Sequence, residues 1–276
     1  MKQRLYRVRE NRNQTVKVEL MSKAPTIRFS DRVENYVRYR PGYPPEVMQL
    51  LRDECGLTAE SVIADIASGT GIFTKMFLDN GNSVFAVEPN LEMREKADQL
   101  LAHYDRLVSA TGSAEQTTLP PASVDFVTAA QAAHWFDLQK TRAEFVRILK
   151  PRGWCVLVWN ERATDSTPFL CDYEELLLAH GTDYREVRHE RTTEIIPEFF
   201  APMQCKERTF ELRQQFDYAG LAGRLLSSSY APLPGHPHHE PMMAQLQKVF
   251  AAHARDEKVE FEYKTRVFYG RLTNGD

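Results

Sequence analysis

The most constraining feature of the sequence is a glycine-containing turn within residues 62–74. An apolar run rich in Val, Ile and Ala ends at Asp65, and Gly69 and Gly71 follow before apolar residues return at helical spacing. This order predicts a strand, a tight turn and a helix. Glycines allow positive φ, and a helix that begins near Gly71 directs its free N–H groups towards the turn. The turn is therefore predicted to bind a ligand.

A second apolar strand ends at Glu88, about 20 residues after the first glycine, where βαβ nucleotide sites place a ribose-binding carboxylate. Two cofactors fit this unit, a dinucleotide and S-adenosylmethionine (SAM). The dinucleotide fingerprint has a third glycine where this chain has Thr74. A carboxylate at Asp65 would repel a pyrophosphate but could hold the ammonium group of SAM. The residues favour SAM, with a βα turn that binds nothing as the alternative.

The segments Asp65-Ile-Ala-Ser-Gly-Thr-Gly71 and Glu88-Pro-Asn90 resemble the nucleotide loop of class I SAM-dependent methyltransferases. The resemblance implies a Rossmann-like, doubly wound α/β fold. Its mostly parallel, seven-stranded sheet would have an antiparallel strand near the C-terminus, with N-terminal helices and a helical C-terminal insertion that forms a lid. SAM would be the cofactor and S-adenosylhomocysteine (SAH) the product. The implied cofactor-binding residues of this region are Asp65, Ala67, Gly69, Thr70, Gly71, Glu88 and Pro89.

Residues 29–44 contain a Tyr-x-x-Tyr-Arg-Pro-Gly-Tyr-Pro pattern, which resembles a segment that covers the cofactor in small-molecule members of the same family. By that resemblance Arg40 pairs with the SAM carboxylate through a bidentate contact. Tyr36, Tyr39 and Tyr43 would border the substrate. Alternatively, the three tyrosines only pack a helical hairpin onto the sheet.

Two later segments extend the resemblance. Residues 111–115 resemble the turn at the adenine edge, which makes Ser113, Ala114 and Glu115 candidates for contact with the base, with a plain turn as the alternative. Residues 129–137 follow the fourth predicted strand, and ligands in open α/β sheets bind at the carboxyl ends of strands. This loop supplies Gln131 to the cofactor side of the site, and His134, Trp135 and, from the next strand, Trp159 to the substrate side.

His134 is the one candidate for a catalytic residue. A histidine near its ordinary pKa can act as a general base, whereas a histidine beside a tryptophan can also be a packed, hydrogen-bonded residue. Both interpretations stay open from the sequence. We expect an aromatic-lined pocket for a small, largely uncharged, planar acceptor.

The composition and charge of the chain limit the classes of partner that it can be expected to bind. The 276 residues carry a formal net charge of −3 with acids and bases interspersed, which disfavours a nucleic-acid substrate. Four scattered cysteines without a C-x-x-C pair are typical of reduced thiols, so a cytoplasmic protein is expected. No apolar run approaches a membrane span. Prolines break the spacing of His236, His238 and His239, so we expect no metal.

The chain is expected to form a disordered tail at 1–28 and a single domain at 29–276. Lid elements would lie at about 29–55 and 214–256. Helices are predicted at 168–180, 217–226 and 241–254, and the last two strands at 205–213 and 259–269.

The predicted function is methyl transfer from SAM to a small-molecule acceptor by a monomer or homodimer. The alternatives are a dinucleotide-dependent oxidoreductase, an RNA-modifying methyltransferase and a SAM-binding protein without turnover.

Overall fold

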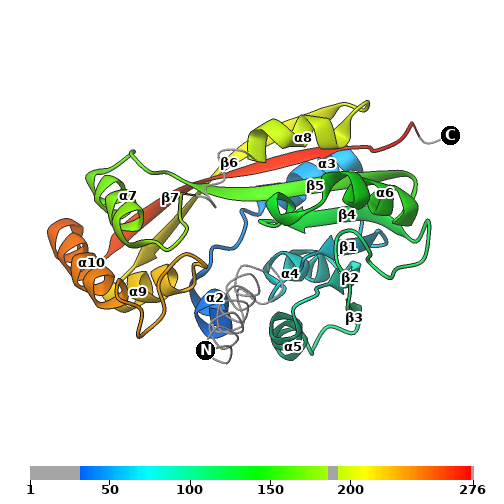
Figure 1. The fold of residues 1–276 in the computed structure, drawn as a ribbon. Coiled ribbons are helices and arrows are strands. Elements are labelled where there is room, and N and C mark those ends of the chain that lie inside the picture. Colours follow the sequence, from blue (N-terminus) through cyan, green and yellow to red (C-terminus); the bar gives the residue numbers. More distant parts are fainter. Residues whose placement is uncertain (1–31, 186–191, 275–276) are drawn as a thin grey trace, which may run out of the picture.

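The computed structural model describes residues 32–185 and 192–274, which are organised around a seven-stranded sheet (Figure 1). The strand order is β3-β2-β1-β4-β5-β7-β6, with parallel pairing from β3 through β5, and β7 antiparallel to both β5 and β6. This topology confirms the predicted fold class. The strands are β1 (Val62–Ile66), β2 (Ser83–Val87), β3 (Leu107–Ala110), β4 (Val124–Ala130), β5 (Leu149–Arg162), β6 (Cys205–Phe216) and β7 (Val259–Gly270).

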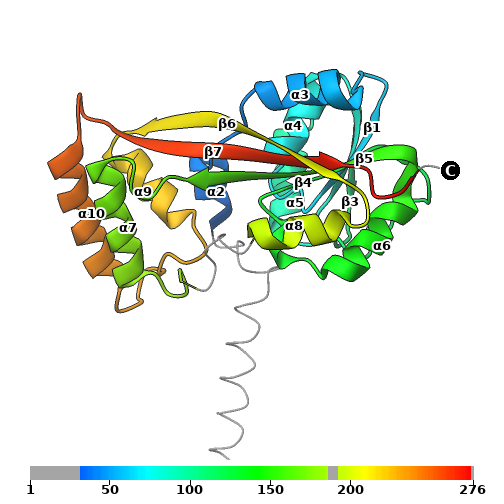
Figure 2. The ribbon, with the colours of Figure 1, turned by 90° about the horizontal axis from the view of Figure 1, so that it is seen from above.

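Helices cover both faces of the sheet, as Figure 2 shows from above. Helices α3 and α4 pack on one face, and α6 and α8 pack on the other. None of the helices in the described ranges is long and apolar enough to cross a membrane. The helices are α2 (Val33–Tyr39), α3 (Glu46–Cys55), α4 (Ile72–Asp79), α5 (Leu91–Leu100), η2 (Ala133–Trp135), α6 (Leu138–Ile148), α7 (Pro168–His180), α8 (Thr192–Phe200), α9 (Tyr218–Leu226) and α10 (His239–His253).

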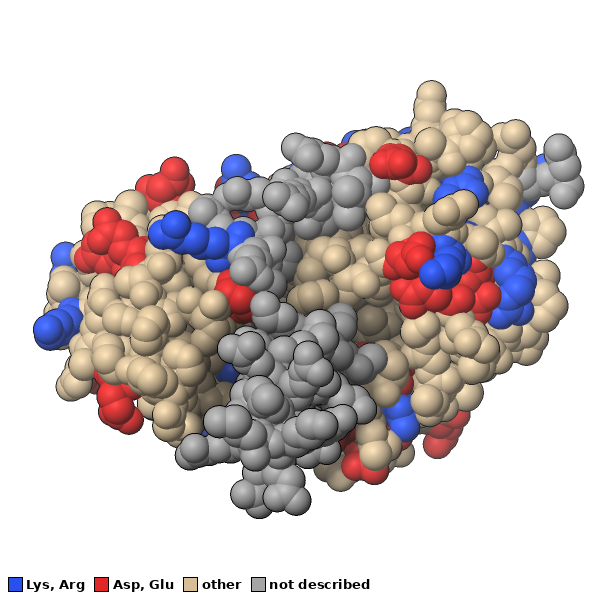
Figure 3. All heavy atoms as spheres, viewed as in Figure 1, with Lys and Arg blue, Asp and Glu red and all other residues tan. Residues whose placement is uncertain are grey.

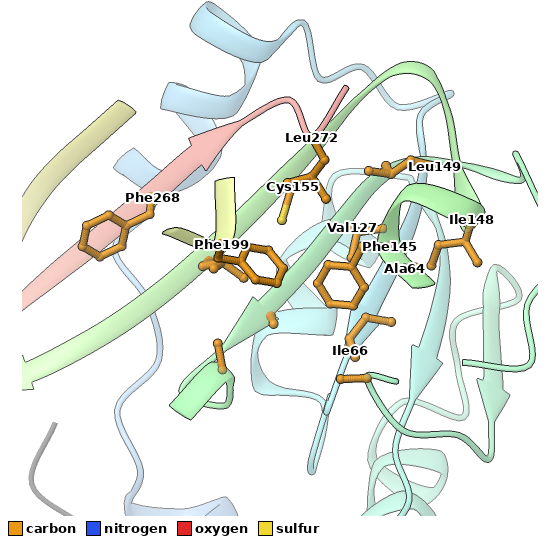
Figure 4. Close-up of a cluster of buried hydrophobic side chains, with 14 of the residues drawn as sticks. Ala64, Ile66, Val127, Phe145, Ile148, Leu149, Cys155, Phe199, Phe268 and Leu272 are labelled. Atoms are coloured by element: carbon orange, nitrogen blue, oxygen red, sulfur yellow. The ribbon is translucent and has the colours of Figure 1, made fainter. Parts of the chain in front are cut away.

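Alternating side chains of the buried strands supply both cores. In β1, Ile63 faces the α3 and α4 side, whereas Ala64 and Ile66 face the α6 and α8 side. Figure 4 shows this second core, in which Phe145 of α6 and Phe199 of α8 lie with ring centroids 5.8 Å apart. The sheet is therefore buried on both faces, which explains why most residues of β1 and β4 are apolar.

Strands β5, β6 and β7 run beyond the central sheet and carry a second lobe made of α7, α9 and α10 (Figures 1 and 2). This lobe has its own apolar core, in which Phe261 of β7 packs against Tyr173 of α7 with ring centroids 4.9 Å apart. Leu221 of α9 and Leu246 of α10 are fully buried in the same core. Helix α2 packs against α9, so the N-terminal and C-terminal segments that were expected to form lids lie against each other.

The element positions differ from the sequence predictions in two places. Helix α8 was not predicted, because Pro197 interrupts its apolar pattern. Strand β5 covers Leu149–Arg162, whereas the apolar pattern predicts a strand only over Trp154–Trp159, because the segment around Pro151 forms an irregularity between two paired stretches of the same strand. The predicted tail at 1–28 lies outside the described residues. That the segments 29–55 and 214–256 act as lids stays a prediction.

Candidate active site

A cavity of about 510 Å³ opens at the carboxyl ends of β1, β2, β4 and β5 and reaches the second lobe. The chain proceeds outward from β1 through β2 to β3 and then returns to β4 on the other side of β1. Open α/β sheets bind ligands at such a reversal of strand order. The cavity volume lies within the range of about 300 to 1,000 Å³ that is usual for small-molecule sites.

Asp65 lies near the carboxyl end of β1, where two hydroxyl groups fix its carboxylate. The Thr74 hydroxyl donates to Oδ2 at 2.6 Å, and the Thr128 hydroxyl donates to Oδ1 at 2.9 Å. Burial raises the pKa of Asp65 to about 6, although both hydrogen bonds act in the opposite direction. Thr74 occupies the place of the third glycine in the dinucleotide fingerprint. In this protein the Thr74 side chain instead orients the Asp65 carboxylate.

Glu88 follows β2, and its carboxylate holds the glycine turn. Its two oxygens accept hydrogen bonds from the backbone N–H groups of Gly69 and Asn90, both at 2.8 Å. Burial raises the pKa of Glu88, and these two hydrogen bonds partly oppose that shift. Each carboxylate oxygen can accept more than one hydrogen bond, and Glu88 lines the cavity. The side chain therefore shapes the turn and remains able to bind a ligand.

The two glycines of the turn have different surroundings. A Cβ added at Gly69, where φ is +58°, would meet no atom within 4 Å, so the backbone there is open. A Cβ at Gly71, where φ is +84°, would lie 2.6 Å from the side chain of Leu101. Between them, the buried hydroxyl oxygen of Thr70 has no hydrogen-bond partner in the described part of the chain. Gly69 leaves space at the cavity, whereas Gly71 allows the turn to pack against the end of α5.

Two residues other than glycine adopt left-handed backbone conformations beside the cavity. Ala67 follows β1 with φ of 54°, and Gln131 follows β4 with φ of 57°. Gln131 is held by its backbone N–H, which donates to the Val158 carbonyl at 2.8 Å, and by its side chain, which donates to the Asn160 carbonyl at 3.0 Å. Such strain persists where the surrounding structure fixes it, often at functional sites.

The turn after β3 and the loop after β4 meet at the same cavity. Ser113 and Gln116 exchange backbone hydrogen bonds of 3.0 and 3.2 Å, which form a tight turn around the buried Ala114. Glu115 accepts a hydrogen bond from the backbone N–H of Asp137 at 3.0 Å. This contact links the predicted adenine-edge turn to the start of α6.

His134 and Trp135 lie in the short helix η2 and line the cavity. Their rings pack against each other with centroids 4.7 Å apart. A packed histidine beside an open cavity is compatible with both interpretations of His134 that the sequence left open.

The N-terminal segment closes another side of the cavity. The guanidinium of Arg40 lies over the ring of Tyr36, 5.0 Å from its centroid, and donates to the Ser227 carbonyl of the second lobe at 3.0 Å. Tyr43 packs edge-on against Phe73 of α4, with ring centroids 4.8 Å apart. Burial raises the pKa of Tyr43 well above its ordinary value. Tyr36, Arg40 and Tyr43 all line the cavity.

Most of the predicted site residues come together at this one cavity, and three do not. Trp159 is 1% exposed in the sheet core, where it packs against Phe268. Tyr39 packs against Phe216 and occupies the space beside Gly223 of α9. Gly71 is the third. The predicted residues that line the cavity are Tyr36, Arg40, Tyr43, Asp65, Ala67, Gly69, Thr70, Glu88, Pro89, Ser113, Ala114, Glu115, Gln131, His134 and Trp135.

The second lobe contributes cavity residues that the sequence did not single out as site residues. They are polar or aromatic and come from β7, α9 and the segments before α7, after α7 and after α9: Thr164, Tyr184, Arg224, Ser229, Tyr230 and Tyr263. Glu161 and Arg162 also line the cavity, as expected from their position at the carboxyl end of β5. For one of the second-lobe residues, Arg224, the sequence contains a recognisable signal. Arg224 is the only charged residue within the apolar run 221–226, and a charge in the buried face of a helix needs a specific partner.

The histidines after α9 do not form a metal site. The rings of His236 and His238 lie with centroids 5.4 Å apart, and His239 contacts the Pro232 carbonyl through Nδ1 at 2.9 Å. Across the described ranges, no three His, Cys, Asp or Glu side chains are grouped so that they could hold a metal ion.

Comparison with known proteins identifies the central part of the chain. Residues 64–157 match the model of a methyltransferase domain family. An uncharacterised methyltransferase of Mycobacterium tuberculosis is 38% identical over 137 residues, which are 50% of this chain and 54% of the relative. A methyltransferase-like protein of Schizosaccharomyces pombe is 31% identical over 170 residues, which are 61% of this chain and 65% of the relative. The matched stretch thus spans only about half to two thirds of these relatives.

Two solved structures share the fold over most of their length. A proposed type II methyltransferase of Anaeromyxobacter dehalogenans has a TM-score of 0.63 at 23% identity, and the match covers 85% of this chain and 98% of that one. A proposed methyltransferase from an antibiotic biosynthesis pathway of Anabaena variabilis has a TM-score of 0.61 at 22% identity, covering 86% and 100%. These similarities establish the fold. Residues 64–157 therefore match a methyltransferase domain family, and the sheet that contains them has the fold of these two structures.

The residues at the cavity fit SAM, the cofactor that the sequence predicts. Asp65 offers a carboxylate for an ammonium group, Glu88 retains acceptor capacity for ribose hydroxyls, and the open backbone at Gly69 allows close approach. The hydroxyl of Thr70 and Nε of Arg40 are buried polar groups that lack a hydrogen-bond partner among the described residues. Unpaired buried polar groups are costly, so a ligand that binds them is favoured.

Proposed function

We propose that this protein transfers the methyl group of SAM to a small-molecule acceptor and releases SAH. The observation that carries the proposal is the cavity of about 510 Å³, which joins the methyltransferase turn to a second lobe. The acid at the end of β1, the acid after β2 and the open glycine backbone lie on one side of it. An acceptor would occupy the opposite side, between η2 and the second lobe.

The size and walls of the cavity support a small acceptor. Residues of α2, η2, α9 and β7 surround the space, so a bulky acceptor would have to displace packed elements. On the face shown in Figure 3, acidic and basic side chains are mixed, which is unlike the continuous basic surface of a nucleic-acid binder. The similar protein of Anabaena variabilis is described as part of an antibiotic biosynthesis pathway, which also supports a small-molecule acceptor.

Each residue would have a defined task. Asp65 would hold the ammonium group, Glu88 the ribose hydroxyls, and Arg40 the carboxylate of the cofactor. When bound, SAM supplies an activated methyl group, so the protein mainly has to orient the acceptor and exclude water. His134 lines the cavity, and in this proposal it would orient the acceptor or accept its proton.

The test is SAH release from SAM in the presence of a panel of small hydroxyl, amine and carboxyl compounds, compared with a bulk tRNA preparation. We expect release to depend on a small compound and to be lost in the Glu88→Ala variant at low SAM concentration. An exposed substitution, Arg152→Met, is the matched control and should keep full activity. Transfer to tRNA alone, or no binding of SAM, would contradict the proposal.

A further inference from the structure

The second-lobe side of the cavity contains two guanidinium groups without an acidic partner. Arg224 is 6% exposed; its Nε donates to the Tyr263 hydroxyl at 3.3 Å and its Nη1 to the Ser228 hydroxyl at 3.1 Å. Arg40 donates to the Ser227 carbonyl through Nη2. Among the side chains that the structure describes, no Asp or Glu forms an ion pair with Arg40 or Arg224.

A third arginine of the same cavity shows how the lobe compensates a buried cation. Arg162 donates to the Glu174 carboxylate at 2.5 Å, and both side chains are only about one tenth exposed. Tyr184 donates to the same carboxylate oxygen, Oε2, at 2.6 Å. Arg224 lacks such a counter-charge, although it is buried to a similar degree.

Two neighbouring unpaired cations are energetically unfavourable. Burial lowers the pKa of Arg40, and the charge of Arg224 lowers it further. A buried charge without a partner is destabilising, because no attractive interaction offsets its removal from water. Proteins retain such arrangements where a ligand supplies the missing charge.

The charges of the cofactor do not remove this imbalance. SAM has one carboxylate, which the proposed function assigns to Arg40, and its ammonium group belongs with Asp65. Arg224 would then remain without an anion. Guanidinium groups bind carboxylates through two parallel hydrogen bonds, and Nη2 of Arg224 has no hydrogen-bond partner within the described ranges.

We propose that Arg224 binds a carboxylate of the methyl acceptor, so that the enzyme's substrate is a small organic acid. This inference rests on the proposed function and deepens it. One surplus positive charge matches a singly charged carboxylate better than a phosphate dianion. Tyr230 and Tyr263 also line the cavity, and the Tyr263 hydroxyl lies beside Arg224, so the two residues would add an aromatic wall and a hydrogen-bonding group. The acceptor is therefore anionic, not uncharged as the sequence led us to expect.

The experiment measures the melting midpoint of the SAH-saturated protein at constant ionic strength. The probes are benzoate, cinnamate, hexanoate and succinate, each compared with its own amide, which has a similar shape but no charge. The variants are Arg224→Met, which removes the charge at similar volume, and the exposed control Arg152→Met. Circular dichroism and SAH titration verify that each variant folds and binds the cofactor product.

We expect at least one acid to raise the melting midpoint of the wild-type protein while its amide does not. The Arg224→Met variant should lose this shift, with affinity for the acid at least about tenfold weaker, whereas Arg152→Met should keep it. No difference between any acid and its amide, or an unchanged shift in Arg224→Met, would overturn the inference. If Arg224→Met does not fold, the comparison of acids with amides on the wild type decides alone.

The outcome separates the two proposals. Binding of SAH is measured before any acid is added. Failure of SAH to bind would contradict the proposed function, whereas SAH binding without any response to acids would contradict only the role of Arg224.

Discussion

The pH dependence of cofactor binding gives a quantitative test of Asp65. Its carboxyl group has a pKa of about 6 in the folded protein, mainly because it is buried. An ammonium group would pair with the ionised form, so binding below pH 6 requires release of a proton. If binding depends on the ionised form, affinity should be about tenfold weaker at pH 5 than at pH 7, which corresponds to about 1.4 kcal/mol.

Calorimetric titration of SAH between pH 5 and pH 8 measures this effect. SAH carries the same ammonium and carboxylate groups as SAM but cannot transfer a methyl group. Titrations at pH 5 in buffers with different ionisation enthalpies should show release of nearly one proton per SAH bound. In the Asp65→Asn variant, binding should be weak and nearly independent of pH. A wild-type affinity that is constant from pH 5 to pH 8 would refute the assignment.

The same group has the opposite effect on the stability of the ligand-free protein. Below about pH 4, Asp65 is protonated in both the folded and the unfolded state. Between about pH 4 and pH 6 the unfolded chain loses this proton while the folded protein retains it, so the free energy of unfolding falls as the pH rises. The loss should total about 3 kcal/mol and remain constant above pH 6. Denaturant titrations of the wild type and Asp65→Asn across this range measure it.

Five further substitutions have expected outcomes. Glu88→Ala should weaken SAH binding at least tenfold, because a charged hydrogen-bond partner contributes about 1.5 to 3 kcal/mol; unchanged calorimetric affinity would contradict this. Gly69→Ala should lose SAH affinity and should lose stability only through its left-handed backbone, by about 1 kcal/mol. Gly71→Ala should lower the melting midpoint further, because its Cβ would also meet Leu101 at 2.6 Å; equal stability of the two variants would be the contrary result. Phe145→Ala should destabilise the protein by about 3 to 5 kcal/mol in denaturant titration. His134→Gln should remove a rising limb of the pH–rate profile if His134 is a base, lower the rate at every pH if it orients the acceptor, and change nothing if it is only packed.

The sequence predicted the central fold because its strongest patterns are local. The acids at the ends of two apolar strands and the glycines between them identify β1, α4 and β2 without knowledge of tertiary contacts. The same holds for α7, which occupies Pro168–His180 as predicted, because Thr167 caps a long apolar helical run. Helix α8 was missed because Pro197, which lies inside it, argues locally against a helix.

The residues that the second lobe contributes to the cavity were harder to predict from the sequence. Residues of the nucleotide turn are close in sequence, so a resemblance over a few residues placed most of them together. Arg224 and Tyr263 line the cavity because β5 to β7 extend beyond the central strands and carry the second lobe (Figure 2). Trp159 illustrates the reverse error, since its side chain faces the sheet core although its position in β5 suggested the pocket. Side-chain direction in a strand alternates, and one register step decides it.

The most direct test of the central claim is a calorimetric comparison of SAH with NAD⁺. Both ligands contain an adenosine ribose that Glu88 could hold, but only SAH has the ammonium group that Asp65 is placed to bind. The account predicts binding of SAH at one site per chain and no measurable binding of NAD⁺. Binding of NAD⁺ without binding of SAH would contradict it.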